Sequence, residues 1–107
     1  MKLYRVVSGA EATQAKTRGL PATTGGSASG WIGKRLYFWG SKDSARAWRS
    51  YFIRLADLQG KKKPDLVVLT AYVPGSDVIS EDNPTPVARD FGEVFYITRD
   101  LKPSEAR

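Results

Sequence analysis

The sequence contains no cysteine and no histidine. Without cysteine the chain has no disulfide, no thiolate nucleophile and no cysteine-ligated zinc site. Without histidine it has no Ser–His or Cys–His catalytic pair and no imidazole ligand for a metal. Any chemistry must therefore use carboxylates, hydroxyls, lysine, arginine and backbone groups, and we expect no metal. The missing cysteine fits any compartment, so it indicates nothing about redox conditions.

Long apolar runs are missing as well. No stretch of the sequence approaches the roughly 18 apolar residues of a membrane-spanning helix. The start of the chain lacks the basic end and apolar stretch of a secretion signal. We therefore expect a cytoplasmic chain with no membrane partner and no signal peptide.

The residues that are present fit one soluble globular domain over residues 1–107. Apolar residues make up 41% and charged residues 26% of the chain, ordinary proportions for a folded protein. The formal net charge is +6, and the first 63 residues hold 13 lysines and arginines against 3 acids, whereas the rest hold 4 against 8. This asymmetry favours an anionic partner on the basic side, although solvated charges distributed by chance explain it equally well.

Residue patterns predict alternating strands and helices, and hence an α+β domain. Aromatic and β-branched runs predict strands at residues 2–7, 35–39, 66–73 and 92–98. Helical spacing predicts two helices, at residues 10–18 and 42–58. We expect loops at residues 21–33 and 81–91, and a frayed tail after Leu101.

Local signals define both helices. Ser8 and Glu11 have the spacing of a capping box, in which each side chain accepts from the other residue's amide. Gly19 stands where a glycine ends a helix. In the second helix an apolar stripe recurs at helical spacing, and we expect it to lie in the core; its members are Ala45, Trp48, Phe52 and Leu55.

Three polar residues lie in strands that should be largely buried: Arg5, Tyr37 and Glu93. A buried charge is costly unless it is paired or faces a cleft. Spacing alone favours a structural ion pair between Arg5 and Glu93, or a place for both on a wet sheet face, over a functional site. Convergence of the three side chains on one cleft would reverse that preference.

Three motifs occur in an order that resembles the ADP-ribosyltransferase superfamily. Residues 3–8 (LYRVVS), followed by a short helix and Gly-Leu, are similar to the opening of the cholera-toxin-type enzymes. Residues 36–41 (LYFWGS) resemble the second strand, with Tyr37 where the poly-ADP-ribose-polymerase-like branch carries a tyrosine. Residues 92–97 (GEVFYI) resemble the closing strand, which carries the catalytic glutamate of the superfamily.

The resemblance implies a fold of split mixed or antiparallel β-sheets with two helices, and NAD as co-substrate. It implies that Glu93 is catalytic and holds the ribose 2′-hydroxyl while the sugar becomes oxocarbenium-like. It assigns Arg5 to a phosphate or ribose hydroxyl, Tyr37 to the face of the nicotinamide ring, and the backbone of Val6 to the nicotinamide amide. It also implies that the NAD pocket is walled by Trp31, Phe38 and Trp39. Each of these side chains would fit the core equally well.

Two departures from the family narrow the expected reaction. Arginine-modifying members carry Glu or Gln two residues before the catalytic glutamate, where this chain has Phe91, and the Ser-Thr-Ser of the cholera-type strand is absent. We therefore expect a mono-ADP-ribosyltransferase acting on a non-arginine protein side chain, a nucleic acid or water. Such an enzyme would be a bacterial or phage toxin or effector. It would reside in the cytoplasm or be delivered into that of a target cell. A further expected partner is a cognate inhibitor or immunity protein.

A second hypothesis keeps the fold without catalysis, as a basic nucleic-acid-binding module. Positive charge and rings that can stack on bases combine in Arg35, Tyr37, Trp39, Arg46 and Arg49. The lysine run at residues 61–63 is typical of a solvated turn. Such binding would weaken steeply with salt and would not depend on Glu93. A tRNA 2′-phosphotransferase is disfavoured, because that family relies on histidine and this chain has none.

Overall fold

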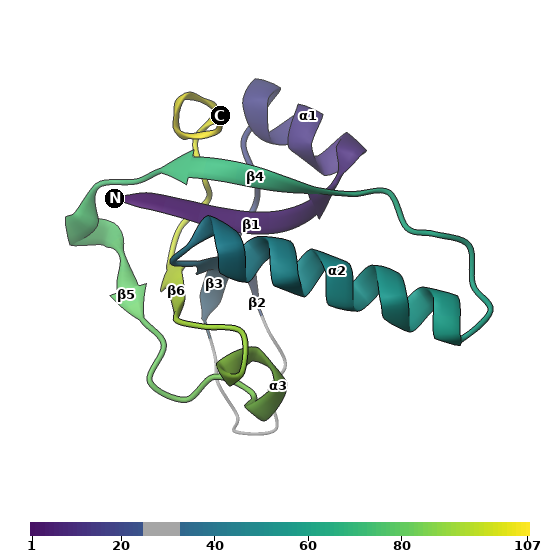
Figure 1. Cartoon of the computed structure of the whole chain (residues 1–107). Helices are drawn as coiled ribbons and strands as arrows, with labels where there is room; N and C mark the ends of the chain where they lie inside the picture. The colour runs from purple at the N-terminus through teal and green to yellow at the C-terminus, as the bar shows by residue number, and fades with distance from the viewer. Residues whose placement is uncertain (25–32) are drawn as a thin grey trace.

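A computed structural model describes residues 1–24 and 33–107 of the chain (Figure 1). Its strands span, in chain order, Lys2–Ser8 (β1), Thr23–Thr24 (β2), Lys34–Trp39 (β3), Leu66–Tyr72 (β4), Ile79–Ser80 (β5) and Val94–Ile97 (β6). The order across the sheet is β4–β1–β3–β6–β5, β2 also pairs with β3, and every pairing among the described strands is antiparallel. All four predicted strands are thereby confirmed in position.

Three α-helices complete the α+β fold: Gly9–Thr17 (α1), Lys42–Leu58 (α2) and Pro86–Arg89 (α3). The expectation of two helices misses α3, which lies in the segment expected to be a loop. Two local devices start this short helix: the Thr85 hydroxyl accepts from the Ala88 amide at 3.3 Å, and Pro86 occupies a first-turn position that needs no amide. In the part of the chain that the structure describes, no helix combines the length and apolar character of a membrane span.

The first helix begins and ends as its sequence predicts. The Ser8 hydroxyl accepts from the Glu11 amide and the Glu11 carboxylate accepts from the Ser8 amide, both at 3.1 Å. Gly19 has a φ of +83°, and a Cβ at this position would collide with the carbonyl oxygen of Leu101. The sharp exit after α1 therefore requires glycine twice over, for its dihedral angle and for its size.

The sheet separates into two parts at its centre. β1 pairs with β4 at seven positions and β3 with β6 at four. Between these two parts, β1 and β3 share the single pair Tyr4 and Trp39. In Figure 1, β1 and β4 lie side by side and run crosswise to β3 and β6. β1 and β3 therefore diverge from this pair toward Arg5 on β1 and Tyr37 on β3. The divergence leaves room for a cleft.

The core fills one side of the sheet and α2 partly covers the other. The largest fully buried side chains come from four strands and the tail: Leu3, Phe38, Leu69, Val73, Ile97 and Leu101. Burying each such side chain contributes about 1.5–3 kcal/mol. Ala12 and Ala15 of α1 pack on this core, whereas Trp39 and Ala45 are buried outside it, where α2 meets the sheet.

The expected fraying after Leu101 does not occur. Leu101 forms a bridge with Leu20, and Ala106 forms one with Ala71. Leu101 itself is only 1% exposed. The tail is thus part of the core, because these bridges attach it to the segment after α1 and to β4.

Candidate functional site

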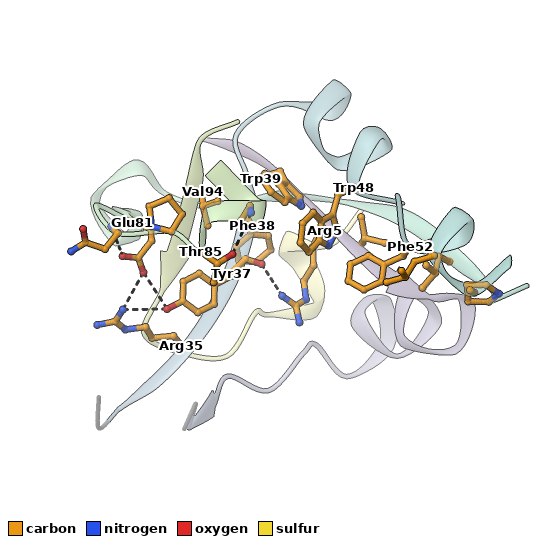
Figure 2. A pocket seen from close by; sticks show the side chains of 18 of the residues that line it. Arg5, Arg35, Tyr37, Phe38, Trp39, Trp48, Phe52, Glu81, Thr85 and Val94 are labelled. Carbon is orange, nitrogen blue, oxygen red and sulfur yellow. Dashed lines mark hydrogen bonds and ion pairs between the residues drawn. The ribbon is translucent and has the colours of Figure 1, made fainter. Parts of the chain in front are cut away.

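A cleft of about 1200 Å³ lies beneath α2, where β1 and β3 diverge (Figure 2). Its walls come from β1, β3 and α2, from the chain entering β4, and from the segment 81–88. Its volume exceeds the roughly 300–1,000 Å³ of ordinary small-ligand pockets. The cleft is therefore suited to an elongated ligand.

One end of the cleft, here called the polar end, is formed by Arg35, Tyr37 and Glu81. The Glu81 Oε2 accepts from the Tyr37 hydroxyl at 3.2 Å and from Arg35 Nη1 at 3.3 Å. Arg35 also donates to the Tyr37 hydroxyl at 3.2 Å, and its guanidinium lies 4.3 Å from the centre of the Tyr96 ring. The Glu81 Oε1 accepts from the Asn83 amide at 3.0 Å. These contacts fix one carboxylate beside two tyrosine rings.

Arg5 lies midway along the cleft. It extends from β1 across the divergence and donates from Nη1 to the Tyr37 carbonyl at 2.8 Å. Its Nε is buried and has no hydrogen-bond partner among the described residues. Burial lowers the pKa of Arg5, and the Glu11 carboxylate partly opposes that change. Because an arginine stays protonated at neutral pH, Arg5 is a half-buried and incompletely satisfied cation.

The other end of the cleft, here called the apolar end, is formed by Trp48, Phe52 and Leu55 of α2. The Trp48 and Phe52 rings meet edge to face with centroids 4.9 Å apart. Of the stripe only Ala45 is buried; Trp48 and Leu55 are half-buried and Phe52 is 38% exposed, so the expectation that the stripe lies in the core is wrong for these three residues. The reason is that α2 extends past the sheet, and its apolar face there meets the cleft instead of a strand. Lys61 lies at the rim of this end.

Glu93 does not lie in this cleft. It is exposed, precedes β6, and lines a separate hollow of about 260 Å³ with Gly40, Ser41 and Phe95. The alternation of side chains along a strand explains its position: Val94 faces the cleft, so the residues on either side of it face away. The structure thus brings Arg5 together with Tyr37 and leaves Glu93 apart, so the expected convergence of three side chains fails.

The other predicted site residues have mixed positions. Val6, Phe38 and Trp39 all line the cleft, but Phe38 is 2% exposed and Trp39 is 7% exposed, so both rings belong mainly to packed regions. Tyr37 is 37% exposed and presents its ring to the cleft. Trp31 lies outside the described residues.

Sequence reasoning missed Glu81, which is the only acidic residue lining the cleft among the residues described. Glu81 follows β5, a strand of two residues. Two residues are too few to show the alternation that identifies a strand and its inward positions. The Glu81 amide nevertheless donates to the Val94 carbonyl at 2.9 Å, which aligns it with the cleft-facing residue of β6.

The described residues that line the site provide cations, one carboxylate, hydroxyls and aromatic rings. In residues 1–24 and 33–107, no group of three or more acidic side chains is placed to hold a metal ion. Comparisons with protein-family models, curated proteins and solved structures find no match for the chain. The function must therefore be argued from the cleft and from the sequence motifs that build it.

Proposed function

We propose that the chain is an NAD-dependent mono-ADP-ribosyltransferase with an ADP-ribosyltransferase-like fold, and that NAD binds in the cleft beneath α2. One observation carries the proposal: Arg5, a half-buried cation that donates a single hydrogen bond among the described residues, lies midway along a cleft with aromatic rings at both ends. NAD has the matching pattern, because two planar rings flank a dianionic pyrophosphate. A guanidinium fork is the side chain best suited to hold such a phosphate group.

The charge of the cleft supports an anionic ligand. Three cations line it, Arg5, Arg35 and Lys61, against Glu81 as the single acid among the described residues. A partly desolvated site strengthens the attraction between these cations and a phosphate. Arg5 lines the cleft and donates only one hydrogen bond among the described residues, from Nη1 to the Tyr37 carbonyl, so its guanidinium has a donor left for a phosphate.

The placement of the motifs adds support. Residues 3–8 form most of β1, and Ser8 caps the helix that follows. Residues 36–41 form the end of β3 and the cap of α2. The first two motifs of the resemblance thus meet at the divergence of β1 and β3, where the cleft opens.

The reaction proposed is cleavage of the nicotinamide–ribose bond followed by transfer of ADP-ribose. Positive charge builds on the sugar as nicotinamide leaves, as in glycoside hydrolysis. Phe91, which replaces the Glu or Gln of arginine-modifying enzymes, packs on Trp39, Trp48 and Tyr51. That position therefore offers no polar group for an arginine acceptor, and we assign the acceptor to another protein side chain, a nucleic acid or water. The biological role that fits is a bacterial or phage toxin or effector.

Titration calorimetry with NAD and chromatography of released nicotinamide test the proposal. The chain should bind NAD and release nicotinamide. Arg5→Met should raise the Kd for NAD by about tenfold or more, since hydrogen bonds to charged groups contribute about 1.5–3 kcal/mol. Arg54→Met is the matched control, because Arg54 is exposed on α2 and does not line the cleft. A chain that neither binds NAD nor releases nicotinamide contradicts the proposal.

One observation favours the second candidate, a nucleic-acid-binding module. Tyr51 and Phe52 are 37% and 38% exposed near the apolar end, and the lysines at residues 61–63 are all exposed nearby in the chain. Arg49, however, donates to the Leu66 carbonyl at 2.6 Å and so serves to hold α2 to β4. A labelled single-stranded oligonucleotide that binds with a steep salt dependence, in a chain indifferent to NAD, would favour this candidate.

A further inference from the structure

We infer that Glu81 is the carboxylate that acts on NAD, and that NAD binds with nicotinamide at the polar end and adenine at the apolar end. This inference rests on the proposed function, since it assigns roles within the same cleft. It replaces Glu93, the residue that the sequence resemblance selects, with a residue that the sequence alone does not reveal. Three observations carry it: the charges at the two ends of the cleft, the position of Tyr37, and the hydrogen bonds that hold Glu81.

The first observation is charge. Nicotinamide is cationic while it is joined to ribose, whereas adenine is neutral. Glu81 is the only acid lining the cleft within the described residues, and it lies at the polar end. At the opposite end, Lys61 would repel the nicotinamide ring. Because Glu81 is paired with Arg35, the polar end is close to neutral, whereas the apolar end carries the cation of Lys61. The cationic ring is therefore better tolerated at the polar end.

The second observation is the position of Tyr37, which contacts both Glu81 and Arg5. Its hydroxyl donates to Glu81 at 3.2 Å, and its carbonyl accepts from Arg5 at 2.8 Å. Figure 2 shows the Tyr37 ring between these two charged groups. The order Glu81, Tyr37, Arg5 along the cleft would place the nicotinamide and its ribose beside Glu81 and Tyr37, and the pyrophosphate near Arg5.

The third observation is how Glu81 is held. Its carboxylate accepts three hydrogen bonds, from Tyr37, Arg35 and Asn83. A carboxylate has about four acceptor sites, which leaves one for a ribose hydroxyl. The ion pair with Arg35 fixes the orientation of the Glu81 carboxylate, and its side chain is only 15% exposed. A fixed, charged and partly desolvated acceptor is the arrangement that stabilises positive charge developing on a bound sugar.

The apolar end suits adenine for a complementary reason. Trp48, Phe52 and Leu55 offer apolar and aromatic surface, and Phe52 is 38% exposed although it faces the cleft. A neutral base that stacks here removes this surface from water, and stacking on an aromatic residue contributes about 1–3 kcal/mol per base. The exposed ring is thereby accounted for by a ligand.

The chemical step balances with water or an acceptor hydroxyl as co-reactant. The bond between ribose C1′ and the nicotinamide nitrogen breaks, and its electron pair leaves with nicotinamide. A bond forms between C1′ and the oxygen of water or the acceptor, and the proton of that oxygen passes to solvent. Glu81 remains ionised, accepts a hydrogen bond from the ribose hydroxyl, and forms no covalent bond.

Two isosteric variants, Glu81→Gln and Glu93→Gln, decide the assignment. Glu81→Gln should lower the rate of nicotinamide release by about 100-fold or more, the usual effect of losing one preorganised electrostatic group, while the Kd for NAD changes little. Glu93→Gln should change neither quantity by more than about twofold. Asp82→Asn is the control for removing an exposed carboxylate from the same segment. A structural role for Glu81 would instead lower the Tm and weaken NAD binding without a selective loss of rate.

The outcomes separate this inference from the proposed function. Loss of rate in Glu93→Gln with retention in Glu81→Gln overturns the inference and leaves the transferase in place. A wild-type chain that releases no nicotinamide overturns both. A second pair of variants tests the orientation even where Glu81→Gln folds poorly: Phe52→Ala should weaken the binding of ADP-ribose, and Tyr37→Ala should weaken inhibition by free nicotinamide. The reverse pattern overturns the inference.

Discussion

Two arginines, Arg99 beside the tail and Arg5 in the cleft, are satisfied to different degrees. Every guanidinium nitrogen of Arg99 donates to the carboxylates of Glu105 and Asp77, at 2.8–3.3 Å. Arg5 donates once, to the Tyr37 carbonyl, and its buried Nε has no partner in the described part of the chain. The same residue type thus completes its hydrogen bonds in one region and leaves them incomplete in the other.

The pKa values of the two arginines move in opposite directions. Hydrogen bonding to Glu105 is the main reason that the pKa of Arg99 is raised, whereas burial lowers that of Arg5. A fully paired group has no donor left for a ligand, so Arg99 serves the fold. An incompletely hydrogen-bonded cation that lines a cleft is an arrangement that a ligand can complete, which is the role proposed for Arg5. Changes at Arg99, Glu105 and Arg5 test this difference.

Arg99→Ala should lower the free energy of unfolding by about 3 kcal/mol, because removing one partner of a largely buried ion pair leaves the other charge unpaired. Glu105 would be that unpaired charge, since it is only 8% exposed. Urea denaturation at neutral pH measures the loss. Arg54→Ala, at an exposed site on α2, should change the free energy by no more than about 0.5 kcal/mol. Equal effects of the two variants would remove the distinction between a paired and a solvated arginine.

Acidification should weaken the same region through Glu105. The hydrogen bond from Arg99 lowers the pKa of Glu105 from its ordinary value of 4.5. A lowered folded-state pKa stabilises the fold above the ordinary value, and that stabilisation is lost as the pH falls through the lowered one. We therefore expect this residue to contribute to the loss of stability as the pH falls below 4.5. Urea denaturation across that pH range should show a shallower dependence for Glu105→Gln; an unchanged dependence would contradict the pairing.

The sequence predicts contacts between residues that are close along the chain and misses those between residues that are far apart. Ser8 and Glu11 lie three residues apart, so their capping box can be read from spacing and is confirmed. Arg99 and Asp77 are separated by 22 residues and meet only after β5 and β6 pair. No local pattern indicates such a contact. The tail was therefore expected to fray, although it is held in place.

The candidate site likewise contains residues whose positions the sequence predicts and residues whose positions it does not. The strand positions of Arg5 and Tyr37 could be predicted, because each lies in a run of aromatic and β-branched residues. The side to which Glu93 points depends on the exact start of β6, at Val94, and strand ends are the least predictable part of a sequence-based assignment. Glu81 enters the cleft through one backbone hydrogen bond to β6, a tertiary contact without a sequence signature. The fold class and the two cleft residues were thus predictable, and the carboxylate was not.

Arg5→Met should change the free energy of unfolding by less than about 1 kcal/mol in either direction, because replacing a buried charge with an apolar side chain of similar length removes a desolvation cost along with its hydrogen bonds. The lost contact is the one with the Tyr37 carbonyl, and the relieved cost is that of the unpartnered Nε. Urea denaturation of this variant beside Arg99→Ala measures both arginines on one scale. A loss as large as that of Arg99→Ala would mean that Arg5 holds β1 to β3, and its incomplete pairing would then no longer indicate a ligand.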